Sequence, residues 1–182
     1  MHRTVLELLP RELRVKGLFP AGRLDVDSTG LVLLTDDGDL AHRMLAPKSH
    51  VPKDYLVRLA KPCTPADAAR LAEGLTLGDG TQCLPAQAKP LPVKGNYALI
   101  CLHEGKYHQV KRMFAALSNH VETLHRVAVG GMILPPELAS GGYVAVLHKD
   151  VENMLKSGNF DAIYERIMTD FSSYSINEVH EV

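Results

Sequence analysis

The chain has 182 residues, a net charge of −1 at pH 7 and 46% hydrophobic residues. These values are typical of a globular protein with one domain, or one domain and an appendage, that can bury a core without disulfides. No apolar run approaches the roughly 20 residues that a transmembrane helix needs. The first residues are too charged for a signal peptide, so we expect a cytoplasmic protein.

The cysteines and the charge distribution limit the kind of protein and the kind of binding partner. Cys63, Cys83 and Cys101 are odd in number and include no CxxC pair, so reduced thiols are expected rather than a disulfide framework or a zinc ribbon. Cys101 and His103 would share one face of a strand, which we interpret as packing, and no metal site is predicted. Residues 150–182 carry a net charge of −5, which leaves a net charge of +4 on residues 1–149. The mildly basic residues 1–149 are therefore compatible with a polyanionic binding partner.

Hydrophobic periodicity and turn residues predict short strands and helices along the chain. The first half is expected to contain a buried strand at Leu31–Thr35, a helix at 38–46 capped by Asp37, a strand around Tyr55–Leu59, and a helix from Thr64 to Gly74. The second half is expected to contain a turn at Asp79-Gly80, a strand at 96–103, a helix from Tyr107 to a C-cap at Asn119, and strands at Val127–Val129 and Tyr143–Leu147. Two polar amphipathic helices, Val151–Lys156 and Phe160–Phe171, are expected before a disordered end.

Grouped strands with few helices predict an α+β fold with a mixed, largely antiparallel sheet flanked by helices. We expect residues 1–149 to form this domain and residues 150–182 to form an acidic helical tail. The sequence shows no internal repeat and no low-complexity linker.

Residues 22–40, GRLDVDSTGLVLLTDDGDL, place Arg23 and Asp25 two positions apart, just before the predicted buried strand. In an extended segment these side chains point to the same side, so a cation would lie beside a rigidly held carboxylate. Such a neighbour keeps the acid ionised, and an ionised carboxylate can serve as nucleophile or base. A surface turn is the ordinary alternative. Asp27 also leaves open a paired-carboxylate glycosidase.

Residues 104–126, EGKYHQVKRMFAALSNHVETLHR, gather Lys106, His108, Gln109, Lys111 and Arg112 at the start of a predicted helix. A solvated helix end is the ordinary explanation. Cations at this end oppose the helix dipole, however, at a cost of a few tenths of a kcal/mol each. We therefore expect an anionic neighbour, either a carboxylate or phosphates.

These two stretches, together with KDYLVRL between them, resemble the RsuA-type family of pseudouridine synthases over about residues 4–143. The resemblance implies the pseudouridine synthase fold and the isomerisation of a specific uridine in ribosomal RNA, most simply small-subunit (16S) rRNA. It also implies that no metal or organic cofactor is used. The expected partner is ribosomal RNA or a ribosomal subunit assembly intermediate.

The resemblance also assigns roles to single residues. Asp25 stands at the position of the family's essential aspartate, and its role as nucleophile or base stays open. Tyr55 matches the tyrosine that packs on the uracil. Lys111 matches the basic residue that pairs with the aspartate, and Arg112 is the alternative for this position. Arg23 matches the loop arginine that takes the place of the flipped nucleotide. The expected RNA-contacting residues are therefore Arg23, Lys106, His108, Gln109, Arg112 and Arg126, although His108 and Gln109 could be structural and Arg126 could instead cap a strand.

The sequence departs from the family pattern in three ways. No S4-type RNA-binding domain and no Lys-Pro strand precede Met1, so a sheet edge is expected to be exposed and could mediate self-association. KDY replaces the usual Lys-Thr-Tyr and places Asp54 beside the ring. Two alternatives to an active enzyme therefore remain: a shortened, inactive relative that binds RNA or protein, and a protein-only interaction module.

Overall fold

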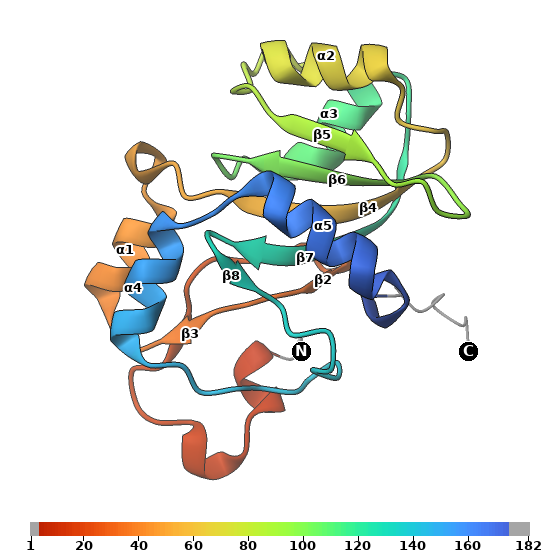
Figure 1. Cartoon of the computed structure of the whole chain (residues 1–182). Coiled ribbons are helices and arrows are strands. Elements are labelled where there is room, and N and C mark those ends of the chain that lie inside the picture. The colour runs from red at the N-terminus through yellow and green to blue at the C-terminus, as the bar shows by residue number, and fades with distance from the viewer. Residues whose placement is uncertain (1–3, 175–182) are drawn as a thin grey trace.

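A six-stranded sheet runs through the structure, a computed structural model that describes residues 4–174 (Figure 1). The strands lie in the order β2 (Ser28–Gly30), β7 (Val121–Val129), β4 (Lys53–Leu59), β6 (Tyr97–Leu102) and β5 (Gln87–Pro90), and β8 (Met132–Ile133) pairs with β7. Among the described pairings of this sheet, β2 with β7 is parallel and the others are antiparallel. A separate antiparallel pair joins β1 (Phe19–Pro20) to β3 (Leu34–Thr35). The predicted mixed, largely antiparallel α+β fold is confirmed.

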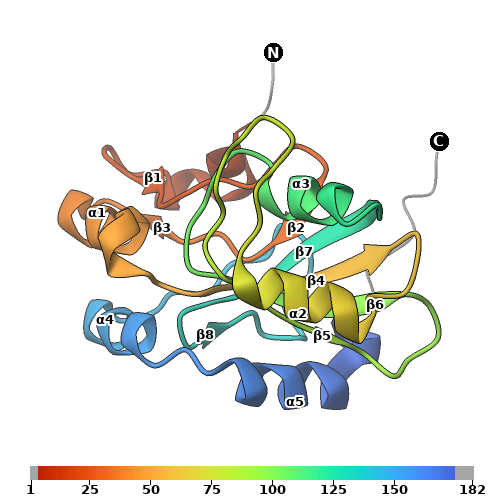
Figure 2. The same ribbon diagram turned by 90° about the horizontal axis from the view of Figure 1, so that it is seen from above.

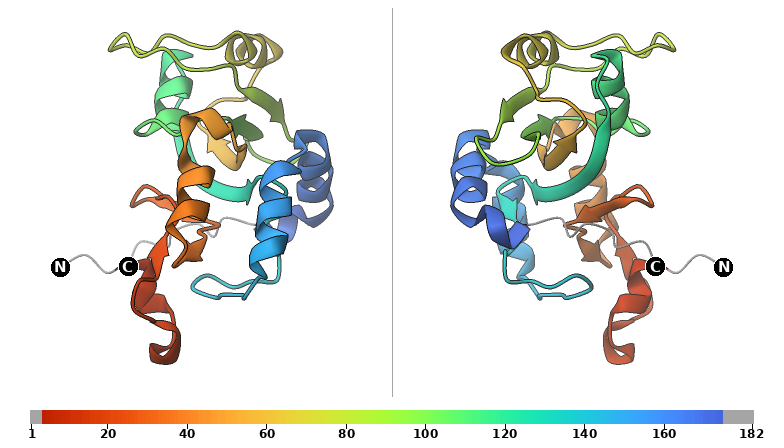
Figure 3. Two further views of the ribbon diagram at one scale, coloured as in Figure 1. Left: turned by 90° about the vertical axis from the view of Figure 1, so that its left-hand side faces the viewer. Right: turned by 90° about the vertical axis from the view of Figure 1, so that its right-hand side faces the viewer.

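Helices cover both faces of the sheet (Figures 2 and 3). On one face, α2 (Pro65–Glu73) and α3 (Gln109–Ala116) bury Leu71 and Phe114 against residues that include Val57 of β4. On the other face, α5 (Phe160–Asp170) buries Ile163 against residues that include Leu56, the neighbour of Val57. Successive residues of a strand point to opposite faces, so β4 supplies both cores.

A third core lies where β7 ends. Here α1 (Gly38–Leu45) and α4 (His148–Lys156) pack Met44 and Leu155 around Val129. Residues 4–174 also contain four short 3₁₀ helices: η1 (Val5–Leu8), η2 (Arg11–Leu13), η3 (Pro47–Ser49) and η4 (Phe171–Tyr174). The two helices predicted for the acidic tail are present as α4 and α5, and both contribute side chains to cores shared with the sheet.

The predicted starts of α1 and α2 are confirmed, whereas α3 begins at Gln109 and not at Tyr107, and α4 begins at His148 and not at Val151. The Asp37 side chain accepts hydrogen bonds from the backbone nitrogens of Asp39 and Leu40, which caps α1. Thr64 caps α2 by accepting from the nitrogen of Asp67, and the helix ends at Gly74. In both cases a side-chain oxygen accepts a hydrogen bond from a backbone nitrogen that has no partner within the helix. Because this interaction is local, the capping residues can be predicted from the sequence.

Three local predictions are wrong. Leu31–Thr35 is not one buried strand, because the chain leaves β2 after Gly30 and pairs again only at β3. Tyr143–Leu147 is not a strand: it runs exposed from the end of the 135–142 turns to α4, outside any described strand pairing. Asn119 does not cap α3, which ends at Leu117, and instead exchanges hydrogen bonds with the backbone of Lys61. The disordered end predicted after the second tail helix lies largely outside the described residues.

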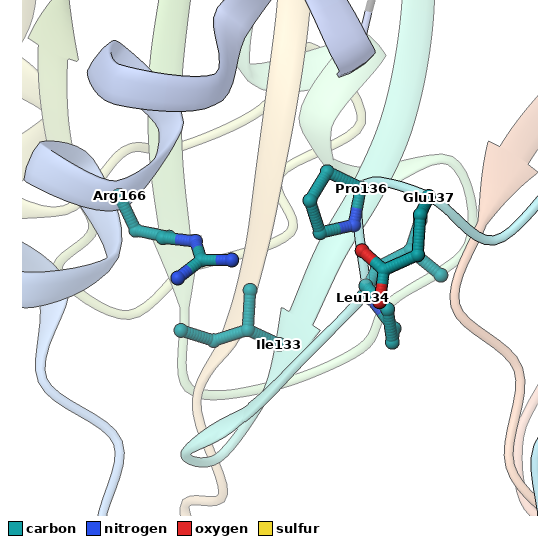
Figure 4. A pocket seen from close by; sticks show the side chains of 6 residues that line it. Ile133, Leu134, Pro136, Glu137 and Arg166 are labelled. Carbon is teal, nitrogen blue, oxygen red and sulfur yellow. The ribbon is translucent and has the colours of Figure 1, made fainter.

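Two cavities are found among the described residues, and Leu40, at the end of the 22–40 stretch, lines the larger one. One, of about 270 Å³, lies between the 133–137 segment and Arg166 of α5 (Figure 4). The other, of about 680 Å³, lies between α1, residues 49–52 and α4. Within residues 4–174, no helix is both long and apolar enough to span a bilayer. The cysteines at positions 63, 83 and 101 are buried free thiols.

Candidate active site

The loop that carries Asp25 connects β1 to β2 and is fastened to β7 by a buried arginine. The guanidinium of Arg126, which is 5% exposed, donates from Nε to the carbonyl of Leu31 at 2.8 Å and from Nη1 to the carbonyl of Arg23 at 3.4 Å. Within the loop, the Ser28 nitrogen donates to the Asp25 carbonyl at 3.0 Å. Both flanks of the Asp25 turn are therefore tied to one side chain of the central sheet.

Lys111 of α3 reaches the carboxylates of this loop. Its Nζ atom lies 3.4 Å from Oδ2 of Asp25 and 2.5 Å from Oδ1 of Asp27. Partial burial opposes the charge of Lys111, but the hydrogen bond to Asp27 and the charges of both aspartates outweigh it and raise the pKa of the ammonium. The same hydrogen bond lowers the pKa of Asp27. The ammonium is thus charged at neutral pH and sits directly beside Asp25.

His108 approaches Asp25 from the residue before α3. Its Nε2 atom lies 3.6 Å from Oδ1 of Asp25. The backbone of His108 is left-handed, with φ 48° and ψ 35°, and this turn points the imidazole back toward the loop. Asp25 is partly open to solvent, with 26% of its side chain exposed. Lys111 of α3 and His108 just before this helix therefore lie on one side of the carboxylate, which remains accessible.

Tyr55 belongs to β4, where it lies opposite Arg126 of β7 next to a break in the strand register. Burial raises the pKa of the Tyr55 phenol, the Arg126 guanidinium opposes that rise, and the negative charge of Asp25 adds to it. The phenol therefore stays neutral at physiological pH. Tyr55 is paired across the strands with Arg126, the residue that holds the carbonyl of Arg23 in the Asp25 loop.

The remaining predicted residues fall into two groups. Arg23 is exposed, and Lys106 forms an ion pair with Glu104. Arg112, the alternative partner for Asp25, instead contacts Asp79 at 2.5 Å and the carbonyl of Tyr107 at 3.3 Å. These three keep positive charge at or near the surface beside the start of α3.

Gln109 and Arg126 are placed differently from the RNA-contacting role expected for them. Gln109 is 4% exposed, accepts from the Lys106 nitrogen at 2.9 Å and donates to Glu104 at 2.6 Å. The Arg126 guanidinium donates to the carbonyls of Leu31 and Arg23 in the Asp25 loop. Both side chains hold backbone in place through these hydrogen bonds.

Two acids have partners in this site that the sequence analysis did not assign to them. Asp27 is the nearer partner of Lys111, and Glu104 anchors Lys106, Gln109 and the backbone nitrogen of Leu84. The lysine hydrogen bond lowers the pKa of Glu104 against the effect of its burial. Both acids lie inside the two quoted motifs, so their positions could have singled them out, but their partners depend on the folded loop geometry.

Comparison with known proteins identifies the family of the chain. The family model described as RNA pseudouridylate synthase matches residues 1–116. The ribosomal small subunit pseudouridine synthase A of Vibrio vulnificus is 46% identical over 146 residues, which is 80% of this chain and 63% of that protein. The protein of the same name from Escherichia coli is 41% identical over 154 residues, 85% of this chain and 66% of that protein.

A solved structure shows the same fold. The chain in a crystal structure of a pseudouridylate synthase superimposes with a TM-score of 0.76 at 43% identity, covering 84% of this chain and 65% of that chain. This chain therefore spans somewhat less than two thirds of the relatives it matches. From the family match and the shared fold, the chain belongs to the RNA pseudouridylate synthase family.

Proposed function

We propose that this chain converts a specific uridine of ribosomal RNA, most simply of the small subunit, to pseudouridine. The observation that carries the proposal is the contact between Asp25 and Lys111 on the scaffold of the family, with Tyr55 paired across the strands to the arginine that holds the Asp25 loop. The printed names of the relatives support small-subunit ribosomal RNA as the substrate. Action on ribosomal RNA, free or within an assembling subunit, implies a cytoplasmic location.

The target uridine must leave the RNA stack before it can reach Asp25, and unstacking costs a few kcal/mol. The exposed Arg23 guanidinium fills the vacated position and binds phosphate. The uracil then packs on the Tyr55 ring, a contact worth about 1–3 kcal/mol. Because the phenol stays neutral, this surface adds no negative charge beside Asp25.

Asp25 then acts on the sugar, as nucleophile or as base, and the N–C glycosidic bond breaks. The uracil turns and rejoins through carbon, so the ring nitrogen gains a proton and the new carbon–carbon position loses one. Lys111 places its ammonium 3.4 Å from Asp25 and holds the carboxylate in position by charge. Arg126 acts as a positioning residue, because it fixes the loop on both sides of Asp25.

A conversion assay tests the proposal. A small-subunit ribosomal RNA transcript is incubated with the protein, and pseudouridine is mapped by carbodiimide treatment and primer extension. We expect one modified position with the wild-type chain and a loss of at least about 10²–10⁴-fold in rate with Asp25→Asn. RNA binding without product under any condition would instead identify an inactive RNA-binding relative. Absence of both product and salt-dependent binding would identify a protein-interaction module.

A further inference from the structure

The strongest feature outside the catalytic cluster is an exposed aromatic ring at its border. Tyr107 is 76% exposed, and it directly precedes His108, whose imidazole approaches Asp25. Resting on the proposed function, we propose that Tyr107 is a stacking platform for a second RNA base, a neighbour of the target uridine. This subsite is separate from the Tyr55 ring that receives the target itself.

The first support is the stack between Tyr107 and His108. Their ring centroids lie 3.8 Å apart and their planes differ by 16°. The imidazole therefore covers one face of the phenol ring, and the high exposure of Tyr107 leaves much of the remaining ring surface open. An open π face beside a reaction centre suits any nucleobase, because every base has a flat face of its own.

The second support is the rigidity of the backbone that carries the ring. The carbonyl of Tyr107 accepts a hydrogen bond from Arg112, which is itself held by Asp79. On the other side, the buried Gln109 amide binds the backbone nitrogen of Lys106. Because the backbone on both sides of the ring is already held, little backbone freedom is lost when RNA binds.

The third support is the charge around the ring. Lys106, Lys111 and Arg112 belong to this turn and to the helix that follows, and they pair with Glu104, Asp27 and Asp79. Exposed Arg23, on the loop that carries Asp25, forms no ion pair with a described residue. An isolated exposed tyrosine is ordinary on a protein surface and needs no explanation. An exposed aromatic ring among cations matches the combination by which proteins hold single-stranded nucleic acid, in which charges follow the phosphates and rings stack on bases.

The chain contains no tryptophan, which gives a direct optical test. Tyr107→Trp introduces a single indole at the platform, and Tyr143→Trp introduces one at a matched tyrosine that is 51% exposed on the segment before α4. Both are titrated with the small-subunit ribosomal RNA transcript and, separately, with oligouridylate. We expect RNA to quench the indole at position 107 and to leave that at position 143 largely unchanged. Binding detected by filter retention without quenching at position 107 would overturn the proposal.

Kinetics give a second, independent readout. Tyr107→Leu is expected to raise KM for the transcript by about 5–150-fold while kcat stays within about twofold, because the lost stack lies outside the reacting groups. Tyr107→Phe keeps the ring and should keep the wild-type KM. An unchanged KM in the leucine variant, with unchanged thermal stability, would overturn the platform. The two proposals can also fail separately. If RNA quenches the indole at position 107 but the wild-type protein makes no pseudouridine, the platform is supported and only the proposed reaction is overturned.

Discussion

Gly30 passes the backbone of Arg126 so closely that a Cβ atom at this position would lie 2.2 Å from the Arg126 carbonyl oxygen and 2.6 Å from its nitrogen. The φ angle of Gly30 is +110°, a conformation that side chains with a Cβ rarely adopt. The parallel pairing of β2 with β7 therefore depends on a glycine here, and Arg126 on the same stretch of β7 holds the Asp25 loop.

Gly30→Ala should destabilise the fold by at least about 1–3 kcal/mol, because the clash is with backbone that cannot move aside without breaking the β2–β7 pairing. Urea unfolding measures the loss. Gly78→Ala is the matched control, since a Cβ there meets no atom within 4 Å and the backbone needs no positive φ. Equal unfolding midpoints for the two variants would contradict the role assigned to this contact.

Arg126→Met removes both donors to the Asp25 loop and keeps a side chain of similar length. We expect kcat to fall about tenfold or more while KM for the transcript changes little, because about 1.5–3 kcal/mol of charge-assisted hydrogen bonding to the loop is lost. The salt dependence of RNA binding separates this role from the alternative one. A phosphate contact would lower the slope of log affinity against log salt by about 1, and a positioning residue should leave it unchanged.

Asp27→Asn tests which carboxylate carries the reaction. Asp27 lies nearer to Lys111 than Asp25 does, but 72% of its side chain is exposed, against 26% for Asp25. Removing the Asp27 charge leaves the ammonium with Asp25 as its partner, so we expect pseudouridine formation to stay within about tenfold of wild type. A loss as deep as that of Asp25→Asn would show that the two acids act as a pair, as in a glycosidase.

Asp54 provides a pH-dependent stability test. It is fully buried, and among the described residues neither carboxylate oxygen has a strong donor, only the weak thiol of its cross-strand partner Cys101. Burial raises the pKa of Asp54 from 3.8 to about 6, with opposing contributions from the Cys101 thiol and the charge of nearby His103. The folded state therefore holds more protons than the unfolded state between these values, so this contribution to stability is complete below pH 3.8 and is lost as the pH rises through 6.

Asp54→Asn removes the ionisation, so the variant should gain stability relative to wild type as the pH rises from 4 to 8, by up to about 3 kcal/mol. Urea unfolding at pH 4, 6 and 8 measures the trend. The same substitution at the exposed Asp36 controls for the loss of one negative charge from the chain. A stability difference between wild type and Asp54→Asn that does not change with pH would contradict the raised pKa.

The sequence predicted those parts of the molecule that depend on neighbours along the chain. The caps at Asp37 and Thr64 are local hydrogen bonds. Residue type and spacing within the two motifs identify Asp25 and Lys111 as candidate site residues. The proposed roles of these two residues stay predictions. Their proximity in the structure agrees with the pairing that was expected of them.

The failures concern contacts between distant parts of the chain. Leu31–Thr35 reads as a strand, but whether it pairs depends on how Gly30 meets Arg126, almost a hundred residues later. Tyr143–Leu147 has the composition of a strand, and composition does not reveal that no neighbour is at hand. Gln109 looks like a ligand-binding residue until its amide is seen to be buried against Glu104.

The proposed reaction centre is assembled from segments that are far apart in the chain, the loop before β2, the strand β4 and the start of α3, which meet only once β7 has paired with both β2 and β4. Such long-range pairing is slow compared with helix formation. During refolding from denaturant, the far-ultraviolet signal of the helices should consequently recover before turnover does, and the lag between the two would time the closure of the central sheet.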